Sequence, residues 1–266
     1  MSCRVLLLSC FVLLAASPCV HLFGADFRIE TKVFSGDETS PQFENVTISQ
    51  RGIVYDFLGG PLLSDSIAEV TIYDPRGRHF TLLDVNRQVK TRIQEDALLQ
   101  FVAEVKIRAL QTGAALAREA AQPNFRAKFD QQLRQLSLTG DRYSYVAMAG
   151  SERFPNAQTS AEYFNFIDMY ARLNATRVGA MPPQARLELN RQLAEHELLP
   201  ASIERTIRSR NPLLGKSKVV RSEHAMVWRL LRQDQKWIDK AAKQRAEFPS
   251  VSFGEYRGLP AGGDAQ

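Results

Sequence analysis

Apolar and polar side chains alternate with a period of two along residues 26–94, a pattern typical of β-strands that bury one face. In residues 27–34, for example, Phe27, Ile29 and Val33 are separated by polar or charged side chains. Short turn-forming sequences divide the region into segments. The pattern predicts strands at residues 27–34, 43–50, 53–58, 67–74, 79–84 and 87–94. We therefore expect an antiparallel meander with one covered face and one solvated face.

The period changes at Glu95, where apolar residues begin to recur at helical spacing. Glu95 and Asp96 are favourable in a first helical turn because they face the positive end of the helix dipole. Few helix breakers follow before Pro123, so the segment predicts a helix of up to about 24 residues, or roughly 36 Å. Gly113 is the position at which this helix could end early.

The rest of the sequence predicts two strand pairs, three helices and a tail. The strands are expected at residues 136–139, 143–149, 203–209 and 219–228. The helices are expected after an N-cap at Ser160, from Pro182-Pro183 until the chain leaves the helix at residues 198–200, and at residues 232–246. Residues 249–266 are rich in Gly and Pro and are expected to be disordered. Since no repeat or linker divides the chain, residues 26–248 predict a single α+β domain: a curved antiparallel β-sheet (meander) covered on one face by several helices.

Residues 1–25 have the order of a secretory signal peptide. Arg4 gives a basic start, residues 5–16 form an apolar core, and small or turn-forming residues precede Asp26. The core is shorter than the roughly 20 apolar residues that a membrane-spanning helix needs. We therefore expect an exported protein, periplasmic or extracellular, from which the signal peptide is cleaved.

Two cleavage points remain open, after Ala25 or after Cys19, and the second fits the preference for small residues better. Cys19 follows Pro18 rather than a small residue, which argues against a lipid anchor. All three cysteines, Cys3, Cys10 and Cys19, lie in this leader. The exported chain is therefore expected to have no disulfide and to depend on its core for stability.

Hydrophobic residues make up 44% of the chain and charged residues 24%, as in soluble globular proteins. The charge is uneven: residues 205–246 carry 12 Lys and Arg against 3 Asp and Glu, a net of +9. This segment could contact anionic lipid headgroups or an acidic partner, or it could simply be a solvated face. Without a recognised binding motif, nucleic acid is not an expected partner. The basic surface that we expect comprises Arg229, Arg232, Lys236, Lys240 and Lys243.

No catalytic or metal-binding pattern is visible in the sequence. The three histidines beyond the leader fit no H-E-x-x-H motif, and no cysteine accompanies them. No nucleophile elbow or glycine-rich phosphate loop appears. Asp56 interrupts an apolar run between Tyr55 and Phe57, and simple alternation favours a solvent-facing carboxylate there. We therefore expect no enzyme activity, no cofactor and no metal.

The predicted sheet offers one strongly apolar face that needs cover, and the predicted helices are the available cover. If they seal the face completely, the result is an ordinary core. If the sheet curves and the helices form a lid, a cavity could hold an acyl chain or a similar apolar ligand. The residues assigned to this face are Phe27, Ile29, Val33, Val46, Ile48, Val70 and Ile72.

Residues 26–94 contain Tyr55-Asp56-Phe57, Tyr73-Asp74-Pro75 and Leu82-Leu83-Asp84, followed by Arg87-Gln88-Val89. In this order of phrases the chain resembles the periplasmic lipoprotein carriers, the LolA/LolB-like proteins, whose open half-barrel sheet is covered by helices. The long helix after the sixth strand and the basic C-terminal helix depart from the carrier pattern. The resemblance implies that a lipid or lipoprotein acyl chain binds in the concave face.

Two functions follow as hypotheses. The first is an exported, non-enzymatic binding module that holds a lipid or acyl chain between the curved sheet and its covering helices. The alternative is a structural or scaffolding protein of the cell envelope that contacts an anionic membrane surface through residues 205–246. A hydrolase without a visible nucleophile or metal set is a third, weaker reading, and the sequence assigns no oligomeric state.

Overall fold

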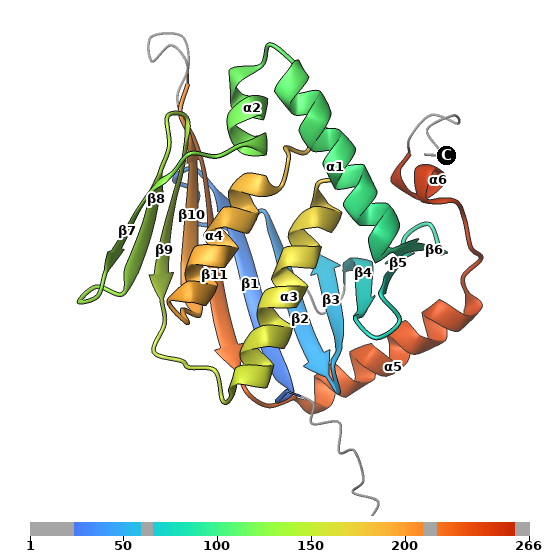
Figure 1. The fold of residues 1–266 in the computed structure, drawn as a ribbon. Coiled ribbons are helices and arrows are strands. Elements are labelled where there is room, and N and C mark those ends of the chain that lie inside the picture. Colours follow the sequence, from blue (N-terminus) through green and yellow to red (C-terminus); the bar gives the residue numbers. More distant parts are fainter. Residues whose placement is uncertain (1–23, 60–65, 210–216, 259–266) are drawn as a thin grey trace, which may run out of the picture.

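Eleven antiparallel strands form one continuous sheet in the computed structural model, which describes residues 24–59, 66–209 and 217–258 (Figure 1). The strands are β1 Phe27–Ser35, β2 Phe43–Gln50, β3 Ile53–Gly59, β4 Ile67–Asp74, β5 His79–Asp84, β6 Val89–Gln94, β7 Arg126–Asp130, β8 Gln135–Thr139, β9 Tyr143–Ala149, β10 Pro200–Ile207 and β11 Lys218–Val227. Their order across the sheet is β6-β5-β4-β3-β2-β1-β11-β10-β9-β8-β7.

Two meanders meet in the middle of this sheet. Strands β1–β6 form the predicted first meander, with tight hairpins such as the one at Arg51 and Gly52, where φ is 52° and 78°. Strands β7–β11 form the second, and β11 pairs with β1, placing Thr31 opposite His224 and Val33 opposite Ser222. The first and last strands of the chain are therefore neighbours at the sheet centre.

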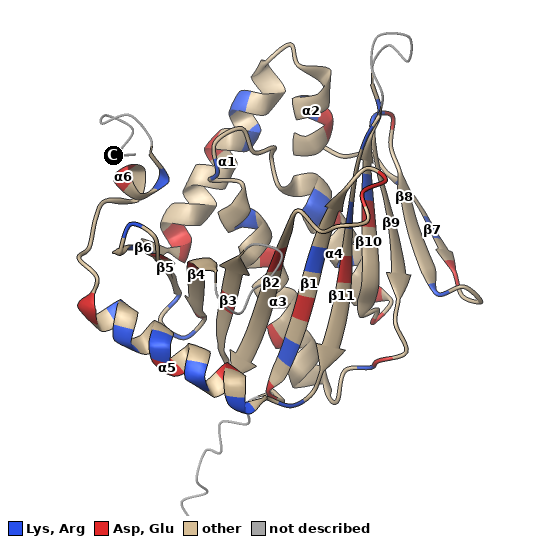
Figure 2. Cartoon of the chain, turned by 180° about the vertical axis from the view of Figure 1, so that it is seen from behind, with Lys and Arg blue, Asp and Glu red and all other residues tan. Residues whose placement is uncertain are grey.

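Helices cover both faces of the sheet, but unequally. The helices are α1 Glu95–Gln111, α2 Ala115–Ala121, α3 Ala157–Asn174, α4 Gln184–Glu195, α5 Arg232–Glu247 and α6 Phe253–Arg257. Helices α1–α4 lie over one face, which we call the helix-covered face (Figure 1). Helix α5 lies across the opposite face, where Ile238 and Ala241 pack on β2–β5 (Figure 2). The predicted class, α+β with a curved antiparallel sheet under helices, is confirmed, and α5 is an addition to it on the second face.

Two apolar lobes fill most of the space beneath α1–α4. The first lobe joins β3–β6 to α1, α3 and α6 through Val54, Tyr73, Phe80, Leu82, Ile93, Leu98, Val102, Phe166, Met169, Leu173 and Tyr256. The second lobe joins β8–β10 to α2 and α4 through Ala120, Leu136, Leu138, Tyr143, Tyr145, Ala147, Ala185, Leu189, Leu193, Leu198 and Ile203. Apolar surface buried in these lobes stabilises the fold by about 25 cal/mol for each Å² removed from water.

The structure corrects four of the expectations about helices, strands and the tail. The helix from Glu95 breaks after Gln111, so that α2 is separate, and β7 was not predicted at all. The N-cap of α3 is Asn156, whose side chain accepts a 2.8 Å hydrogen bond from Thr159 N, rather than Ser160.

The fourth correction concerns the expected disordered tail, which contains α6 and docks on β6. Val251 N donates to Lys90 O at 2.9 Å, and Thr91 Oγ1 donates to Val251 O at 3.0 Å. The last residues of that tail, 259–266, lie outside the described residues, as does the predicted leader up to residue 23. Gly24 and Ala25 are described, and their backbone N–H groups donate to Glu162 and Thr159 of α3.

Candidate functional site

Between the two lobes, five side chains on the centre of the helix-covered face remain half-buried. Thr31 and Val33 lie on β1, and Ser222, His224 and Met226 lie on β11. We call them the central seam. They share a face because Ile29, two residues before Thr31, packs with Met226 against Tyr163 of α3. The seam is thus a half-buried strip of the covered sheet between the two lobes.

The seam has a polar centre with apolar ends. His224 contacts Thr31 Oγ1 through Nδ1 and Ser222 Oγ through Nε2, both at 3.0 Å. Burial, together with the smaller effect of the positive charge of Arg186 on α4, lowers the pKa of His224 to about 3. The imidazole is therefore neutral at physiological pH, one nitrogen donating and the other accepting.

Side chains of α3 and α4 border the seam from above. Phe164 and Ile167 of α3 are half-buried and link the lobes to the cluster around Phe27 and Ile29. Arg186 of α4 donates through Nε to Asn190 Oδ1 at 3.0 Å. The seam therefore combines apolar walls with neutral polar groups and one cationic neighbour, a composition typical of small-molecule sites.

A buried polar network adjoins the seam on β2 and β3. The Asp56 side chain accepts hydrogen bonds from Thr47 Oγ1 and Asn45 Nδ2, both at 2.6 Å, and from Tyr170 Oη at 2.7 Å. Asp56 is only 1% exposed, so its predicted solvent-facing position is wrong. Burial raises the pKa of Asp56, and the three hydrogen bonds oppose that rise. Burial likewise raises the pKa of Tyr170 well above 10, which keeps its hydroxyl protonated as a donor.

The seven residues expected on one apolar face are divided between the two faces. Phe27, Ile29 and Val33 lie on the helix-covered face, at or beside the seam. The other four, Val46, Ile48, Val70 and Ile72, lie on the opposite face and pack beneath α5. The structure thus brings together only the β1 residues of the expected set.

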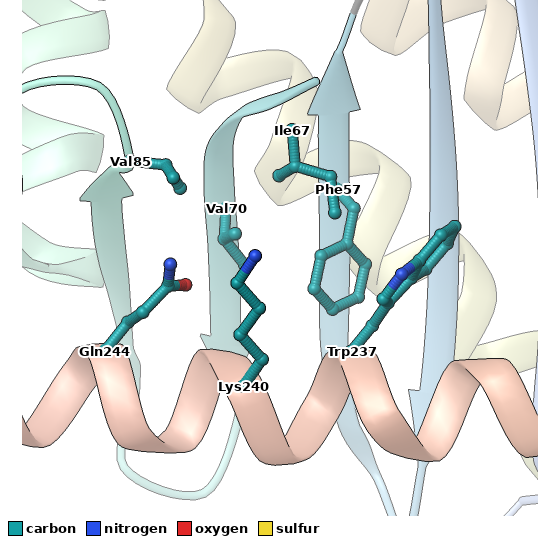
Figure 3. A pocket seen from close by; sticks show the side chains of 7 residues that line it. All are labelled: Phe57, Ile67, Val70, Val85, Trp237, Lys240 and Gln244. Carbon is teal, nitrogen blue, oxygen red and sulfur yellow. The ribbon is translucent and has the colours of Figure 1, made fainter. Parts of the chain in front are cut away.

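A small apolar pocket lies on this opposite face, between the sheet and α5 (Figure 3). Its volume is about 10 Å³, which is room for about one water molecule and not for an acyl chain. Lys240 and Gln244 rise from α5 beside it. Its lining is completed by Phe57, Ile67, Val70, Val85 and Trp237.

The five basic residues expected to form a surface lie on α5 or just before it. All five side chains (Arg229, Arg232, Lys236, Lys240 and Lys243) are exposed. Figure 2 shows Lys and Arg positions recurring along α5. Among these five basic residues, Lys243 forms an ion pair within the described part of the chain: its Nζ lies 3.8 Å from Glu247 Oε1.

No three His, Cys, Asp or Glu side chains among the described residues gather as a metal site. The residues of the seam that sequence reasoning missed, Thr31, Ser222 and His224, come from the two ends of the chain and share no local motif.

No protein-family model and no curated protein matches the chain. The structure is similar to the crystal structure of a LolA superfamily protein from Nitrosomonas europaea, with a TM-score of 0.28 and 10% sequence identity, covering 80% of this chain and 89% of that one. Among the helices that the structure describes, none has the length and apolarity needed to cross a membrane.

Proposed function

We propose that this protein is an exported, non-enzymatic binding module that holds an acyl chain or similar apolar ligand in the central seam. The observation that carries the proposal is the half-buried state of Thr31, Val33, Ser222, His224 and Met226 beneath a layer of helices, between two lobes that are filled. Export rests on the basic, apolar and small-residue order of residues 1–25.

The chemistry of the seam suits an amphiphile. Val33, Met226 and the α3 side chains Phe164 and Ile167 provide apolar surface that a hydrocarbon chain would cover. Met226 is unbranched and adapts to ligands of different shape. The hydroxyls of Thr31 and Ser222, with the neutral His224, offer hydrogen bonds to the polar end of the ligand. Specificity would come from these few polar groups, and affinity from the apolar walls.

Replacing Val33 with glutamine is expected to weaken the uptake of a fluorescent fatty acid by about tenfold. An amide placed against an apolar ligand without a partner costs on the order of 1–3 kcal/mol. Titration of the purified protein with the fluorescent fatty acid measures the effect. Val227→Gln is the matched control, because Val227 is exposed on the other face of β11, and it should bind like the wild type. Failure of the wild-type protein to bind any fatty acid would remove the proposal.

The exposed Lys and Arg residues on and before α5 support a second candidate function, contact with an anionic envelope surface. Each Lys or Arg close to such a surface contributes about 1 kcal/mol to binding. Reversing three charges with Lys236→Glu, Lys240→Glu and Lys243→Glu is therefore expected to abolish the salt-sensitive binding of the protein to vesicles of anionic lipid.

The control for that experiment changes the net charge equally at a distance from α5. Lys106→Glu, Arg126→Glu and Lys128→Glu replace exposed residues on α1 and β7. Sedimentation with vesicles at low and physiological salt distinguishes the two variants. Equal loss in both would mean that net charge alone, rather than the α5 surface, governs binding.

A further inference from the structure

Arg257, the last residue of α6, is deeply buried, and two of its guanidinium nitrogens have no hydrogen-bond partner in the described part of the chain. Its side chain is 6% exposed. Its Nε and Nη2 atoms are buried, and neither has a hydrogen-bond partner among the residues that the structure describes. Buried polar groups in native proteins are almost always paired, so an enclosed guanidinium in this state indicates a partner from outside the described chain.

The two unpaired nitrogens define the shape of that partner. Nε and Nη2 lie on the same edge of the planar guanidinium and point their N–H groups in parallel, which is the arrangement that binds two oxygens of one carboxylate or phosphate. The other side of the group faces Glu69, whose Oε2 is 3.6 Å from Nη1, beyond hydrogen-bond range. The rings of Phe253 and Tyr256, each 5.6 Å from the guanidinium carbon, lie close enough for cation–π contact.

The charges around Arg257 favour an anion. Glu69 Oε1 accepts a 2.6 Å hydrogen bond from Nη2 of Arg177, so one carboxylate serves two guanidinium groups. Burial lowers the pKa of Arg257, and Glu69 restores it in part. The Oη of Tyr256 is also buried without a partner in the described part of the chain. One additional negative charge would balance the two arginines and Glu69.

We propose that the Nε–Nη2 edge of Arg257 binds an oxyanion with two free oxygens, a carboxylate or a phosphate, beneath α6. The site is distinct from the central seam and goes beyond the binding of an apolar ligand there. It is enclosed when α6 is docked, because Arg87 Nη1 donates to Tyr256 O at 2.9 Å and Ser252 caps the helix. Entry of the anion therefore requires α6 to open, and the bound anion holds α6 closed.

The test uses the protein purified as residues 24–266. The probes are sodium acetate and inorganic phosphate, with sodium chloride at equal ionic strength as reference. Thermal unfolding and hydrogen exchange at the Tyr256 amide, which bonds to Ser252 O, are measured against anion concentration. We expect acetate or phosphate, but not chloride, to raise the unfolding temperature and slow exchange of this amide. The anion that gives the larger response shows whether the site prefers a carboxylate or a phosphate.

Variants distinguish the contribution of the two parallel N–H donors of Arg257 from that of its charge. Arg257→Gln should abolish both responses, and Arg257→Lys, which keeps the charge but lacks parallel donors, should weaken anion binding at least tenfold. Arg92→Gln removes an exposed arginine of β6 and should respond like the wild type. The proposal is overturned if the wild-type protein shows no anion-specific response, or if either Arg257 variant retains the full response. The wild-type titration decides the matter even if a variant does not fold.

Discussion

Replacing Arg28 with alanine is expected to lower the free energy of unfolding by about 3–5 kcal/mol. Arg28 Nε donates to Asp234 Oδ1 at 3.0 Å, and the side chain of Asp234 is 1% exposed. Without Arg28, this carboxylate in the first turn of α5 would remain buried without its cation. Its hydrogen bond from Leu231 N, at 2.7 Å, would persist and satisfy only the other oxygen. Urea denaturation of the purified variant measures the loss.

Two further variants show whether the buried charge is the cause. Lys32→Ala removes a residue of the same strand whose ion pair with Glu44 is exposed and 3.8 Å long, and it should change stability by less than about 1 kcal/mol. Asp234→Asn combined with Arg28→Ala should be more stable than Arg28→Ala alone, because the uncompensated charge is gone. A loss no greater for Arg28→Ala than for Lys32→Ala would show that this ion pair does not hold α5 to the sheet.

Replacing Asp56 with asparagine is expected to remove a pH-dependent loss of stability. The folded state raises the pKa of Asp56, chiefly through burial, above its usual value near 3.8. The folded protein therefore binds a proton more tightly than the unfolded chain does. The contribution of this group is fully present below pH 3.8 and falls as the pH rises toward the folded-state pKa. The loss is about 1.4 kcal/mol for each pH unit that separates the two pKa values.

The asparagine variant should therefore gain stability relative to the wild type as the pH rises from 4 to 8. Its side chain can still accept from Thr47 and donate to the Tyr170 hydroxyl. Urea midpoints measured at several pH values give the comparison, and Asp239→Asn, an exposed site on α5, should show no such trend. Parallel curves for Asp56→Asn and the wild type would contradict the raised pKa. Tyr170→Phe, which leaves Asp56 Oδ2 without its donor, should cost about 1–3 kcal/mol near neutral pH.

Alternation along single strands predicts where the strands lie but not which face each residue occupies. The expected apolar face combined Ile29 with Val46 and Ile48. In the sheet, Ile29 pairs with Thr47, so these two side chains share the helix-covered face. Val46 and Ile48, on either side of Thr47, therefore point to the opposite face. An offset of one residue between strands exchanges the faces, and that offset is set by hairpin geometry rather than by composition. Leu82 and Leu83, adjacent and both 0% exposed, are a local sign that this sheet is covered on both faces.

The candidate sites depend on contacts that no local pattern encodes. The seam joins Thr31 to His224, and Asp56 depends on Tyr170, so only the folded sheet brings these groups together. Asp56 was expected in solvent because alternation assumes a wet face, whereas helices cover both faces here. α6 did have a local signal: Ser252 and Glu255 have the spacing of a capping box, and Ser252 Oγ accepts from Glu255 N at 3.1 Å. The helix is only five residues long, too short for a helical period to stand out, and it lies in a Gly- and Pro-rich segment.

The pairing of β1 with β11 has a consequence for how the chain acquires its structure. Arg28 and Val227 face each other in the sheet although they are 199 positions apart in sequence. The strand synthesised first therefore keeps an open hydrogen-bonding edge until nearly all of the chain is available, and a long-range step completes the middle of the molecule. Folding is expected to be slow for a protein of this size. Intermediates that lack β11 present β1 as an edge at which two copies can associate.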